Sequence, residues 1–539
     1  MFRFLIIILL ICVVCSDANN TVTVLTSKGT IIGYKNDGYN MFFGVPYAQV
    51  NEDNPFGSYL VHPHFKKPFD ANDSSIICPQ AFTKVGGILQ CLCLNIYVPS
   101  KASPYESLPV LVWFYGGGFI FGGAGDYDGQ HLVKHNIIVV IVNYRLGPYG
   151  FLCLNDRFVP GNQGLKDQIG ALRWVKKNIE AFGGDPTKVT IAGESYGGGG
   201  VDLHLYSRYG KLFDKAIVQS GSLYTPGFFA KQDYEAAIKL AVHLGHNVFQ
   251  TKEDPLKILS KKNPIIVMTA TKALGLKLTV CKEKRFKGVQ NFITKSRYHL
   301  KNKKKIENTP IMIGYNSKED FGTYVYKPQE FYDSLGDIFQ RYLRNNYILM
   351  KCELETLSNI IRKFYLGSKK IGPESLLELS DYSSDFKLNY AAERSVNRYV
   401  EQNAKVYKYL FSYIGGSVYR NVTGAGAIHT EELKYLFETS SVLTTKEQKM
   451  MRERMTTMWT NFVKYGNPTP TKTALLPVIW KPVTGRTRPY LNIDVKMEMK
   501  DYVYSHRIAF WDLFMQKYDK DSKTSIYQKK NPSVPVIQV

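Results

Sequence analysis

The stretch "TIAGESYGGGG", residues 190–200, decides the fold. An apolar run typical of a buried strand ends here, and Gly193, Ser195 and Gly197 form the pattern G-x-S-x-G. Such a pattern fits a sharp strand-to-helix turn that holds a reactive serine hydroxyl out above a sheet. Because so short a motif also occurs by chance, it indicates a nucleophile only if the chain supplies a base, an acid and an oxyanion site.

The segments around this turn predict an α/β fold. Residues 164–186 show helical spacing of apolar side chains and end at glycines and a proline. The interval 235–400 is more helical and irregular, and we expect it to cap the sheet. Runs that are apolar on both faces favour strands of a buried, mostly parallel sheet, and they occupy residues 109–115, 137–144, 189–193, 215–221 and 405–413.

Composition is consistent with a large globular protein and disfavours a nucleic-acid-binding protein. The 539 residues are 44% hydrophobic and 13% aromatic, which is ample for a sizeable core. The net charge of +23 is partly local, in lysine-dense runs at 281–288 and 301–305. No nucleic-acid-binding motif accompanies this charge, so we interpret it as a solvated face and expect no nucleic-acid partner.

The N-terminus has the features of a secretory signal peptide. Arg3 precedes an apolar run over residues 4–15, and small residues follow. That run is shorter than the roughly 20 residues that cross a bilayer. The sequence therefore predicts a signal peptide at 1–18, with its cleavage site left open, and a secreted single domain at 19–539. A polar tail from about residue 516 has no anchor signal, so no transmembrane anchor is expected.

Cysteines and glycosylation sequons agree with secretion. Six cysteines remain after removal of the signal, too few for a fold that depends on a disulfide framework. Sequons occur at Asn19, Asn72 and Asn421, and Asn72 and Asn421 are the better glycosylation candidates because Asn19 falls almost at the mature terminus.

A glycine triplet upstream of the serine supplies a candidate oxyanion site. In "FYGGGFIFGG", residues 114–123, the glycines directly follow an apolar strand. Their backbone N–H groups have no Cβ to obstruct an oxyanion, and the N–H after the nucleophile points to the same place. We therefore predict that the N–H groups of Gly117, Gly118 and Tyr196 form an oxyanion hole.

Longer motifs identify a family. The segments "NYRLGPYGFL" (143–152), "GNQGLKDQIGALRWVKKNIEAFGGDPTKVTIAGESYGG" (161–198) and "KAIVQSGS" (215–222) resemble the type-B carboxylesterase and cholinesterase family, with insect carboxylesterases most similar in character. The resemblance covers nearly the whole mature chain. It implies an α/β-hydrolase fold, with a large mostly parallel central sheet flanked by helices and a helical cap. It also implies a Ser–His–Glu triad, and nothing indicates a metal or an organic cofactor.

The resemblance implies the partners of Ser195. In "GAGAIHTEELKYLF", His429 stands where the family has its catalytic histidine. The acid falls on Glu319 when counted from Asn316 in "PIMIGYNSKEDFG", and on Asp320 when the following Phe-Gly pair is aligned instead. We favour Glu319 because the family acid is usually Glu. A neutral His429 is needed as the base, so activity is expected to rise through a pKa near about 6.5.

Four further positions either match a residue of the family or depart from the family pattern. By the resemblance, Glu194 corresponds to a buried acid beside the nucleophile, and Ser220 to a serine near the triad. A structural ion pair is the alternative role for Glu194. Tyr115 replaces the usual histidine before the glycine triplet, which implies altered hydrogen bonding around an intact oxyanion hole. Tyr196 replaces the alanine that relatives commonly carry after the serine.

Two predictions concern the cysteines. The family pattern pairs Cys78 with Cys91. Cys93 is adjacent to Cys91, and Cys281 lacks the partner that many relatives have, so both are expected to be free thiols.

The predicted function is a secreted serine carboxylesterase that acts on small or hydrophobic esters through an acyl-enzyme on Ser195. Residues 78–91 contain no Trp for a quaternary ammonium group, which disfavours a choline-ester specialist. The Gln-Ser-Ala elbow of juvenile hormone esterases is also absent. The alternatives are an inactive or slow cholinesterase-like adhesion protein and an ester-sequestering protein. The oligomeric state, monomer or dimer, stays open.

Overall fold

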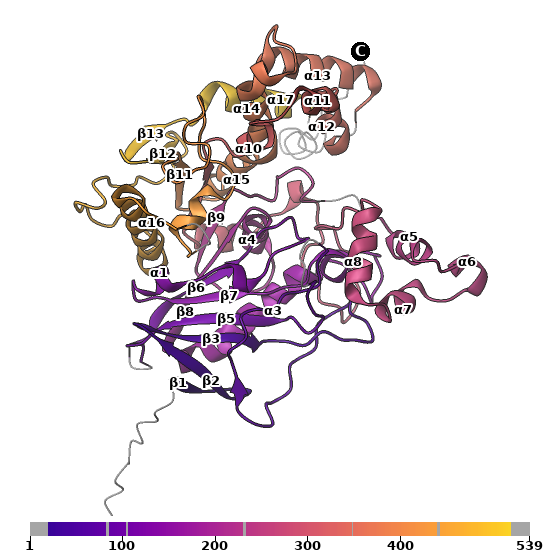
Figure 1. The fold of residues 1–539 in the computed structure, drawn as a ribbon, viewed down its shortest axis with the longest axis vertical. Coiled ribbons are helices and arrows are strands. Elements are labelled where there is room, and N and C mark those ends of the chain that lie inside the picture. Colours follow the sequence, from indigo (N-terminus) through magenta and orange to yellow (C-terminus); the bar gives the residue numbers. More distant parts are fainter. Residues whose placement is uncertain are drawn as a thin grey trace, which may run out of the picture.

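The chain folds around one mixed sheet (Figure 1). The computed structural model describes residues 20–81, 86–103, 106–229, 233–347, 349–438 and 442–518. Within them, the strand order is β1-β2-β3-β5-β7-β6-β8-β9-β10-β11-β12-β13, with β4 beside β2. The strands are β1 (Thr21–Thr26), β2 (Gly29–Asn36), β3 (Tyr39–Pro46), β4 (Phe69–Asp70), β5 (Cys93–Pro99), β6 (Leu108–Phe114), β7 (Ile138–Val142), β8 (Gly184–Glu194), β9 (Lys215–Gln219), β10 (Ile311–Asn316), β11 (Val406–Phe411), β12 (Pro489–Ile493) and β13 (Glu498–Asp501).

The central strands, from β7 through β12, pair in parallel. Strands β7, β9, β10 and β11 are buried along their whole length, as expected for a sheet covered on both faces. Antiparallel pairs extend the sheet at both ends. The five predicted apolar strands are confirmed as β6, β7, β8, β9 and β11. Because parallel strands end at the same edge, the segments that follow β6, β8, β10 and β11 meet there.

Helices connect these strands. The predicted helix within residues 164–186 is confirmed as α3. Helices α3 and α4 both pack against β8, and α1 contacts α16. The helices are α1 (Gln130–Val133), α2 (Gly147–Phe151), α3 (Gln163–Asn178), α4 (Tyr196–Tyr206), α5 (Ala236–His243), α6 (Val248–Thr251), α7 (Pro255–Ser260), α8 (Pro264–Ala273), α9 (Lys303–Glu307), α10 (Phe321–Tyr324), α11 (Gln329–Leu335), α12 (Ile338–Asn346), α13 (Lys351–Leu366), α14 (Leu376–Ser384), α15 (Tyr390–Val400), α16 (Lys446–Tyr465) and α17 (Ser505–Tyr518). Shorter helical turns are η1 (Ala124–Asp126), η2 (Ile179–Phe182), η3 (Arg297–His299), η4 (Pro373–Ser375), the π-helical η5 (Asp385–Asn389) and η6 (Glu431–Tyr435).

The interval 235–400 forms two helical groups and one sheet strand. Helices α5 to α8 lie together on one side of the molecule, and α10 to α14 gather with α17 at the top of Figure 1. The second group has its own apolar core, in which Trp511 of α17 is fully buried. The expectation that this interval only caps the sheet was incomplete, because β10 lies in the sheet between β9 and β11.

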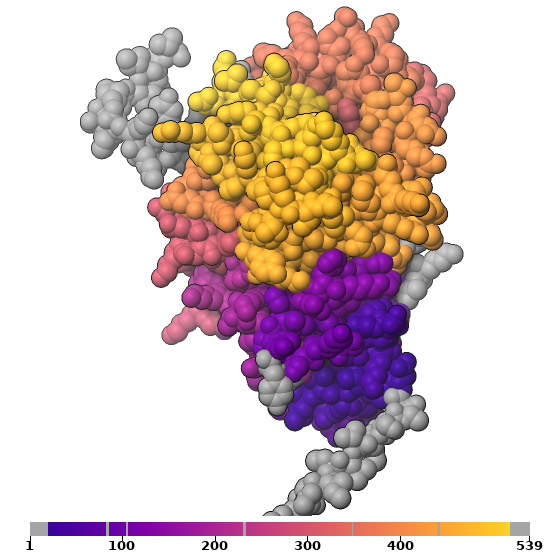
Figure 2. Space-filling model, turned by 90° about the vertical axis from the view of Figure 1, so that its left-hand side faces the viewer, coloured from indigo at the N-terminus to yellow at the C-terminus, as the bar shows by residue number. Residues whose placement is uncertain are grey.

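The two ends of the described chain belong to the same body. Orange and yellow C-terminal segments lie directly against purple N-terminal ones in Figure 2, and β1 and β13 are strands of one sheet. Helix α17 continues to Tyr518, past the predicted start of the polar tail at about 516. The signal peptide predicted at 1–18 and the rest of the tail lie outside the described residues. No helix among the described residues is long and apolar enough to cross a membrane.

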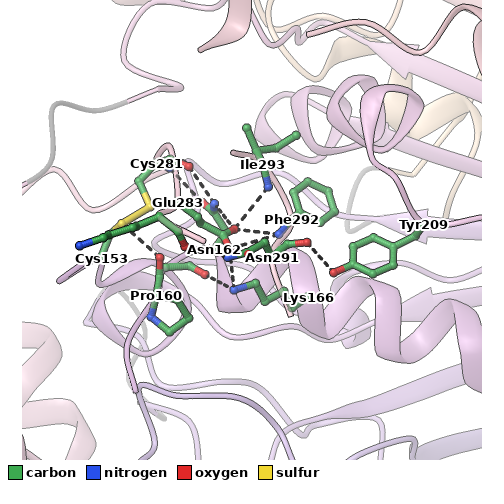
Figure 3. Close-up of polar contacts among 12 residues, drawn as sticks. Cys153, Pro160, Asn162, Lys166, Tyr209, Cys281, Glu283, Asn291, Phe292 and Ile293 are labelled. Carbon is green, nitrogen blue, oxygen red and sulfur yellow. Dashed lines mark hydrogen bonds and ion pairs between the residues drawn. A yellow bond between two sulfur atoms is a disulfide. The ribbon is translucent and has the colours of Figure 1, made fainter. Parts of the chain in front are cut away.

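Two disulfides join described residues of the chain. Cys78 pairs with Cys91, which confirms the family-based prediction. Cys93 is a buried free thiol, also as expected. The prediction for Cys281 was wrong, because Cys281 is bonded to Cys153 with their Cα atoms 6.7 Å apart (Figure 3). The two residues are 128 positions apart in sequence, and only the fold brings α2 and the segment after α8 together.

Most of the predicted surface features lie where they were expected. Asn72 and Asn421 are exposed, whereas Asn19 lies outside the described residues. In the lysine-dense run at 281–288 the basic side chains are exposed and Glu283 is buried among them. In the run at 301–305, however, Lys305 is partly buried and donates to the carbonyl oxygens of His204 and Tyr209.

Candidate active site

Ser195 occupies a strained turn between β8 and α4. Its backbone angles are φ 56° and ψ −125°, a combination that a residue with a side chain rarely adopts. The Ser195 N–H donates to the carbonyl of Gln219 over 2.9 Å, which ties the turn to β9. A Cβ on Gly197 would lie 2.1 Å from the carbonyl oxygen of Phe114, so the tight turn requires glycine there. The local sequence thus holds the serine at the edge where the central strands end.

The glycines after the turn lie in α4, as predicted. A Cβ on Gly198 would come within 2.7 Å of the Gln219 carbonyl, and one on Gly199 within 2.4 Å of the Phe228 ring. At Gly200 the nearest atoms would be 3.4 Å away. Gly198 therefore allows the helix to approach the sheet closely, and Gly199 leaves room for the Phe228 ring. Gly200 is not required by packing.

The three side chains predicted as a triad are in contact. His429 Nε2 lies 3.0 Å from Ser195 Oγ, and His429 Nδ1 lies 2.7 Å from Glu319 Oε2. Glu319 follows β10 and His429 follows β11, so the parallel register brings them to the edge that also carries Ser195. Glu319 is 3% exposed, which keeps water away from the ion-pairing carboxylate.

Glu319 is held in place by further donors. Its Oε1 accepts from the Ser220 hydroxyl at 2.6 Å and from the Asn316 N–H at 2.7 Å. The backbone N–H of His429 donates to the Glu319 carbonyl over 2.9 Å. Ser220 therefore lies beside the triad, as expected, and both Glu319 oxygens have partners.

Asp320, the alternative acid, points to a different partner. Its Oδ2 lies 2.7 Å from Lys387 Nζ, and its Oδ1 accepts from the Thr323 hydroxyl at 2.8 Å. Of Glu319 and Asp320, only Glu319 is in contact with His429.

The glycine triplet forms a turn close to Ser195. Gly117 and Gly118 have positive φ angles of 86° and 65°, and a Cβ on Gly116 would come within 2.8 Å of the Ser195 Cβ. Among the described residues, no acceptor pairs with the N–H groups of Gly117, Gly118 or Tyr196. These donors are thus available to a ligand oxygen beside the serine.

Glu194 approaches the histidine from the side of the serine. Its Oε1 lies 3.1 Å from His429 Nε2, yet it makes no hydrogen bond with any described residue. The side chain is 2% exposed, and burial raises the pKa of this carboxyl to about 8. Glu194 is therefore a buried acid in direct contact with the triad.

The charge around His429 alters its protonation. Burial lowers the pKa of the imidazole, but the negative charges of Glu194 and Glu319 outweigh burial and raise it above the usual value. The pKa through which activity is expected to rise therefore lies above the value of about 6.5 that the sequence predicts.

A buried polar network behind the triad escaped the sequence analysis. Glu432 is fully buried and accepts from Asn316 Nδ2 at 2.6 Å and Gln219 Nε2 at 3.0 Å. Gln219 in turn accepts from Trp459 Nε1 at 2.8 Å. The two consecutive glutamates after His429 are a weak sequence signal, because nothing in the sequence distinguishes the buried one.

The two unusual tyrosines occupy defined positions. Tyr115 stacks on Tyr144 with ring centroids 4.6 Å apart, and each hydroxyl donates to the other residue's carbonyl. The Tyr196 ring meets Phe119 edge-on at 5.2 Å and Phe228 at 5.3 Å. Tyr115 is thus buried beneath the glycine turn, and Tyr196 forms part of an aromatic wall.

A cavity of about 910 Å³ opens onto Ser195, Glu319 and His429. Its walls include Tyr196, Phe229 and Phe386. A space of this size accepts a small organic ligand.

This fold, with a serine turn, a histidine and a buried glutamate at the edge of a parallel sheet, defines an α/β-hydrolase. Residues 20–511 match the model of the carboxylesterase family. Human carboxylesterase 5A is 30% identical over 508 residues, which cover 88% of this chain and 84% of that protein. Venom carboxylesterase-6 of Apis mellifera is 30% identical over 490 residues, covering 83% and 86% of the two chains.

A solved structure supports the same fold. The crystal structure of juvenile hormone esterase from Manduca sexta, with OTFP covalently attached, superposes with a TM-score of 0.79 at 28% identity. The match covers 93% of this chain and 100% of that one. The chain belongs to the carboxylesterase family, as the motifs indicated, and is a carboxylic ester hydrolase.

Proposed function

We propose that this protein is a secreted serine carboxylesterase with Ser195 as nucleophile, His429 as general base and Glu319 as the acid that orients the histidine. The observation that carries the proposal is the continuous contact from Ser195 Oγ to His429 at 3.0 Å and on to Glu319 at 2.7 Å. All three residues line a cavity that is large enough for a small organic ligand.

Acylation uses these contacts in order. Ser195 Oγ attacks the ester carbonyl while its proton passes to His429 Nε2, and Glu319 stabilises the resulting imidazolium. The N–H groups of Gly117, Gly118 and Tyr196 bind the tetrahedral oxyanion. His429 then protonates the departing alcohol as its C–O bond breaks, which leaves an acyl ester on Ser195.

Deacylation repeats these steps with water. His429 takes a proton from water as the oxygen attacks the acyl carbonyl, and returns it to Ser195 Oγ when the carboxylic acid departs. The unpaired N–H donors beside Ser195 support this assignment, because they face a position where both tetrahedral intermediates would develop charge.

A fluorophosphonate probe tests the nucleophile. Peptide mapping of the labelled protein should place the adduct on Ser195, and Ser195→Ala should remove both labelling and p-nitrophenyl acetate hydrolysis. The loss in turnover should be on the order of 10⁴ to 10⁶. Hydrolysis at the wild-type rate by the alanine variant would overturn the assignment. Stoichiometric labelling with no turnover would favour the sequestering protein instead.

Secretion is part of the same proposal. Two disulfides fit an oxidising compartment, and the apolar N-terminal run has signal-peptide features. Expression of the full chain in insect cells should yield protein in the medium that begins after the predicted signal. Removal of N-glycans should increase its gel mobility, and Asn72→Gln with Asn421→Gln should abolish that change. Retention of the full-length chain inside the cells would contradict secretion.

A further inference from the structure

Four cationic side chains converge on the cavity that contains Ser195. They come from four separate parts of the cap: Lys277 from the segment after α8, Arg297 from η3, Arg344 from α12 and Lys387 from η5. The acidic side chains among the described lining residues are Glu319 and Asp320. The cavity therefore carries more positive than negative charge.

The two carboxylates do not neutralise this excess. Glu319 is occupied by His429 and its neighbouring donors, and Asp320 is paired with Lys387 at 2.7 Å. No carboxylate oxygen of a described residue lies within the 4.0 Å of an ion pair from Lys277, Arg297 or Arg344. Three positive charges thus face the cavity without an ion-pair partner among the described residues.

The arginines have neutral neighbours instead. Arg297 donates to the Tyr298 hydroxyl at 2.9 Å and lies 5.0 Å above the Tyr298 ring. Arg344 donates to Gln340 over 3.3 Å. Both guanidinium groups keep donors free for another partner, and the planar fork of arginine matches carboxylate, sulfate and phosphate oxygens.

The segment that carries Lys277 and Arg297 is firmly anchored. Between them, Cys281 is bonded to Cys153, and its backbone exchanges two hydrogen bonds with the Asn162 side chain, at 2.8 and 2.9 Å (Figure 3). Glu283 forms a fully buried ion pair with Lys166 at 3.0 Å. Upstream of the disulfide, the Val280 N–H donates to Phe228 beside the cavity wall. These contacts hold residues 280–283, which lie between the two cations, against the part of the fold that carries Ser195.

We propose that the cavity selects esters that carry an anionic group, a carboxylate, sulfate or phosphate, away from the scissile carbonyl. This inference rests on the proposed function, because it concerns the same pocket. The apolar wall formed by Tyr196, Phe229 and Phe386 holds the carbon chain, while the cations bind the charged end. The overall charge of +23 adds long-range attraction for such substrates.

A matched pair of substrates tests the inference. Mono-4-nitrophenyl adipate has a free carboxylate, and methyl 4-nitrophenyl adipate has the same leaving group and nearly the same length without the charge. At low ionic strength the ratio of kcat/KM, charged over neutral, should be about 10. It should fall toward 1 in 0.5 M NaCl, because salt screens exposed charges.

Substitutions of the cationic residues test whether they cause the preference for the charged ester. Each of Lys277→Gln, Arg297→Gln and Arg344→Gln should reduce the ratio by about 1.5- to 5-fold, and the triple variant should bring it close to 1. Asp320→Asn should act in the opposite direction and raise the ratio, because it releases Lys387. As a control, the exposed lysines Lys66, Lys101 and Lys472 are changed to Gln together, which removes the same charge elsewhere and should leave most of the preference.

The outcomes separate the two proposals. A ratio of 1 or less at low salt, with normal hydrolysis of the neutral ester, overturns the anionic preference and leaves the esterase mechanism standing. An equal loss in the control triple variant also overturns it, since the charge effect would then be global. If the enzyme hydrolyses neither ester and Ser195 is not labelled, both proposals fall.

Discussion

The carboxylate of Glu194 lies 3.1 Å from Nε2 of His429, almost as close as the 3.0 Å that separates the same nitrogen from Ser195 Oγ. In the proposed mechanism Nε2 accepts the serine proton, so Glu194 and Ser195 compete for this nitrogen. When ionised, Glu194 stabilises the imidazolium that forms during catalysis, but it also favours an already protonated histidine in the free enzyme.

Glu194→Gln should therefore shift the pH profile. The proposed mechanism requires neutral His429, and the negative charge of Glu194 raises the pKa of that imidazole. Removing the charge lowers this pKa, so the acidic limb of kcat/KM should move to lower pH, by about 1 unit or more. The exposed carboxylate of Glu180 supplies the control, because Glu180→Gln should leave the limb in place. An active Glu194→Gln enzyme with an unchanged limb would show that Glu194 does not control His429.

Glu319→Gln and Asp320→Asn should differ strongly in rate. The amide in Glu319→Gln cannot stabilise the imidazolium and favours the wrong histidine tautomer, so kcat should fall by about 10³- to 10⁴-fold. In Asp320→Asn the triad contacts remain, and hydrolysis of a neutral ester should change by less than about 10-fold. Steady-state kinetics on p-nitrophenyl acetate compares them directly. A larger loss of activity in Asp320→Asn than in Glu319→Gln would indicate that Asp320, and not Glu319, is the acid of the triad.

Cys153→Ser should lower stability more than Cys352→Ser. The Cys153–Cys281 bond closes a loop with a sequence separation of 128, and its removal frees the unfolded chain from that constraint. The expected cost is about 2–5 kcal/mol. Cys352 is an exposed free thiol, so its replacement should be close to neutral. Thermal denaturation with and without reductant provides the measurement, and equal midpoints for the two variants would contradict a stabilising role for the disulfide.

Much of the site was predictable because its signals are local. The serine turn depends on glycines next to Ser195, and the central strands are apolar on both faces, so both leave short patterns in the sequence. Strand β10 was less visible, since "IMIGYN" is short and lies among helices. The antiparallel strands β1 to β3 are partly exposed, and their weaker patterns were not recognised as strands.

Other features depend on contacts between distant segments. Cys153 and Cys281 are neighbours only after α2 and the segment beyond α8 have packed together. Glu432 differs from Glu431 in sequence only by position, yet it alone joins the Gln219 and Asn316 network. Glu194 and His429 are far apart in sequence and meet only in the folded chain, so the resulting pKa shift could not be derived from residue types.

Gly198→Ala and Gly200→Ala should change stability in different directions. Glycine is unfavourable in a helix interior by about 0.8–1.0 kcal/mol relative to alanine, so both changes gain from helix propensity. At Gly198 the new methyl group would lie 2.7 Å from the Gln219 carbonyl and 3.0 Å from that of Gly193. These are backbone atoms of β9 and β8, and they can yield only if α4 moves away from the sheet and takes the Ser195 turn with it.

Gly198→Ala is therefore expected to lower the thermal midpoint and to reduce ester hydrolysis, because displacement of α4 moves Ser195 relative to His429. At Gly200 the nearest atoms are side-chain atoms of Gln168 and Leu165 at 3.4 Å, which can adjust slightly. Gly200→Ala should therefore be neutral or stabilising by up to about 1 kcal/mol, with activity retained. Thermal denaturation and p-nitrophenyl acetate kinetics on the two purified variants measure both effects. Equal stability of the two variants would mean that the close approach of α4 to the sheet does not require glycine at position 198.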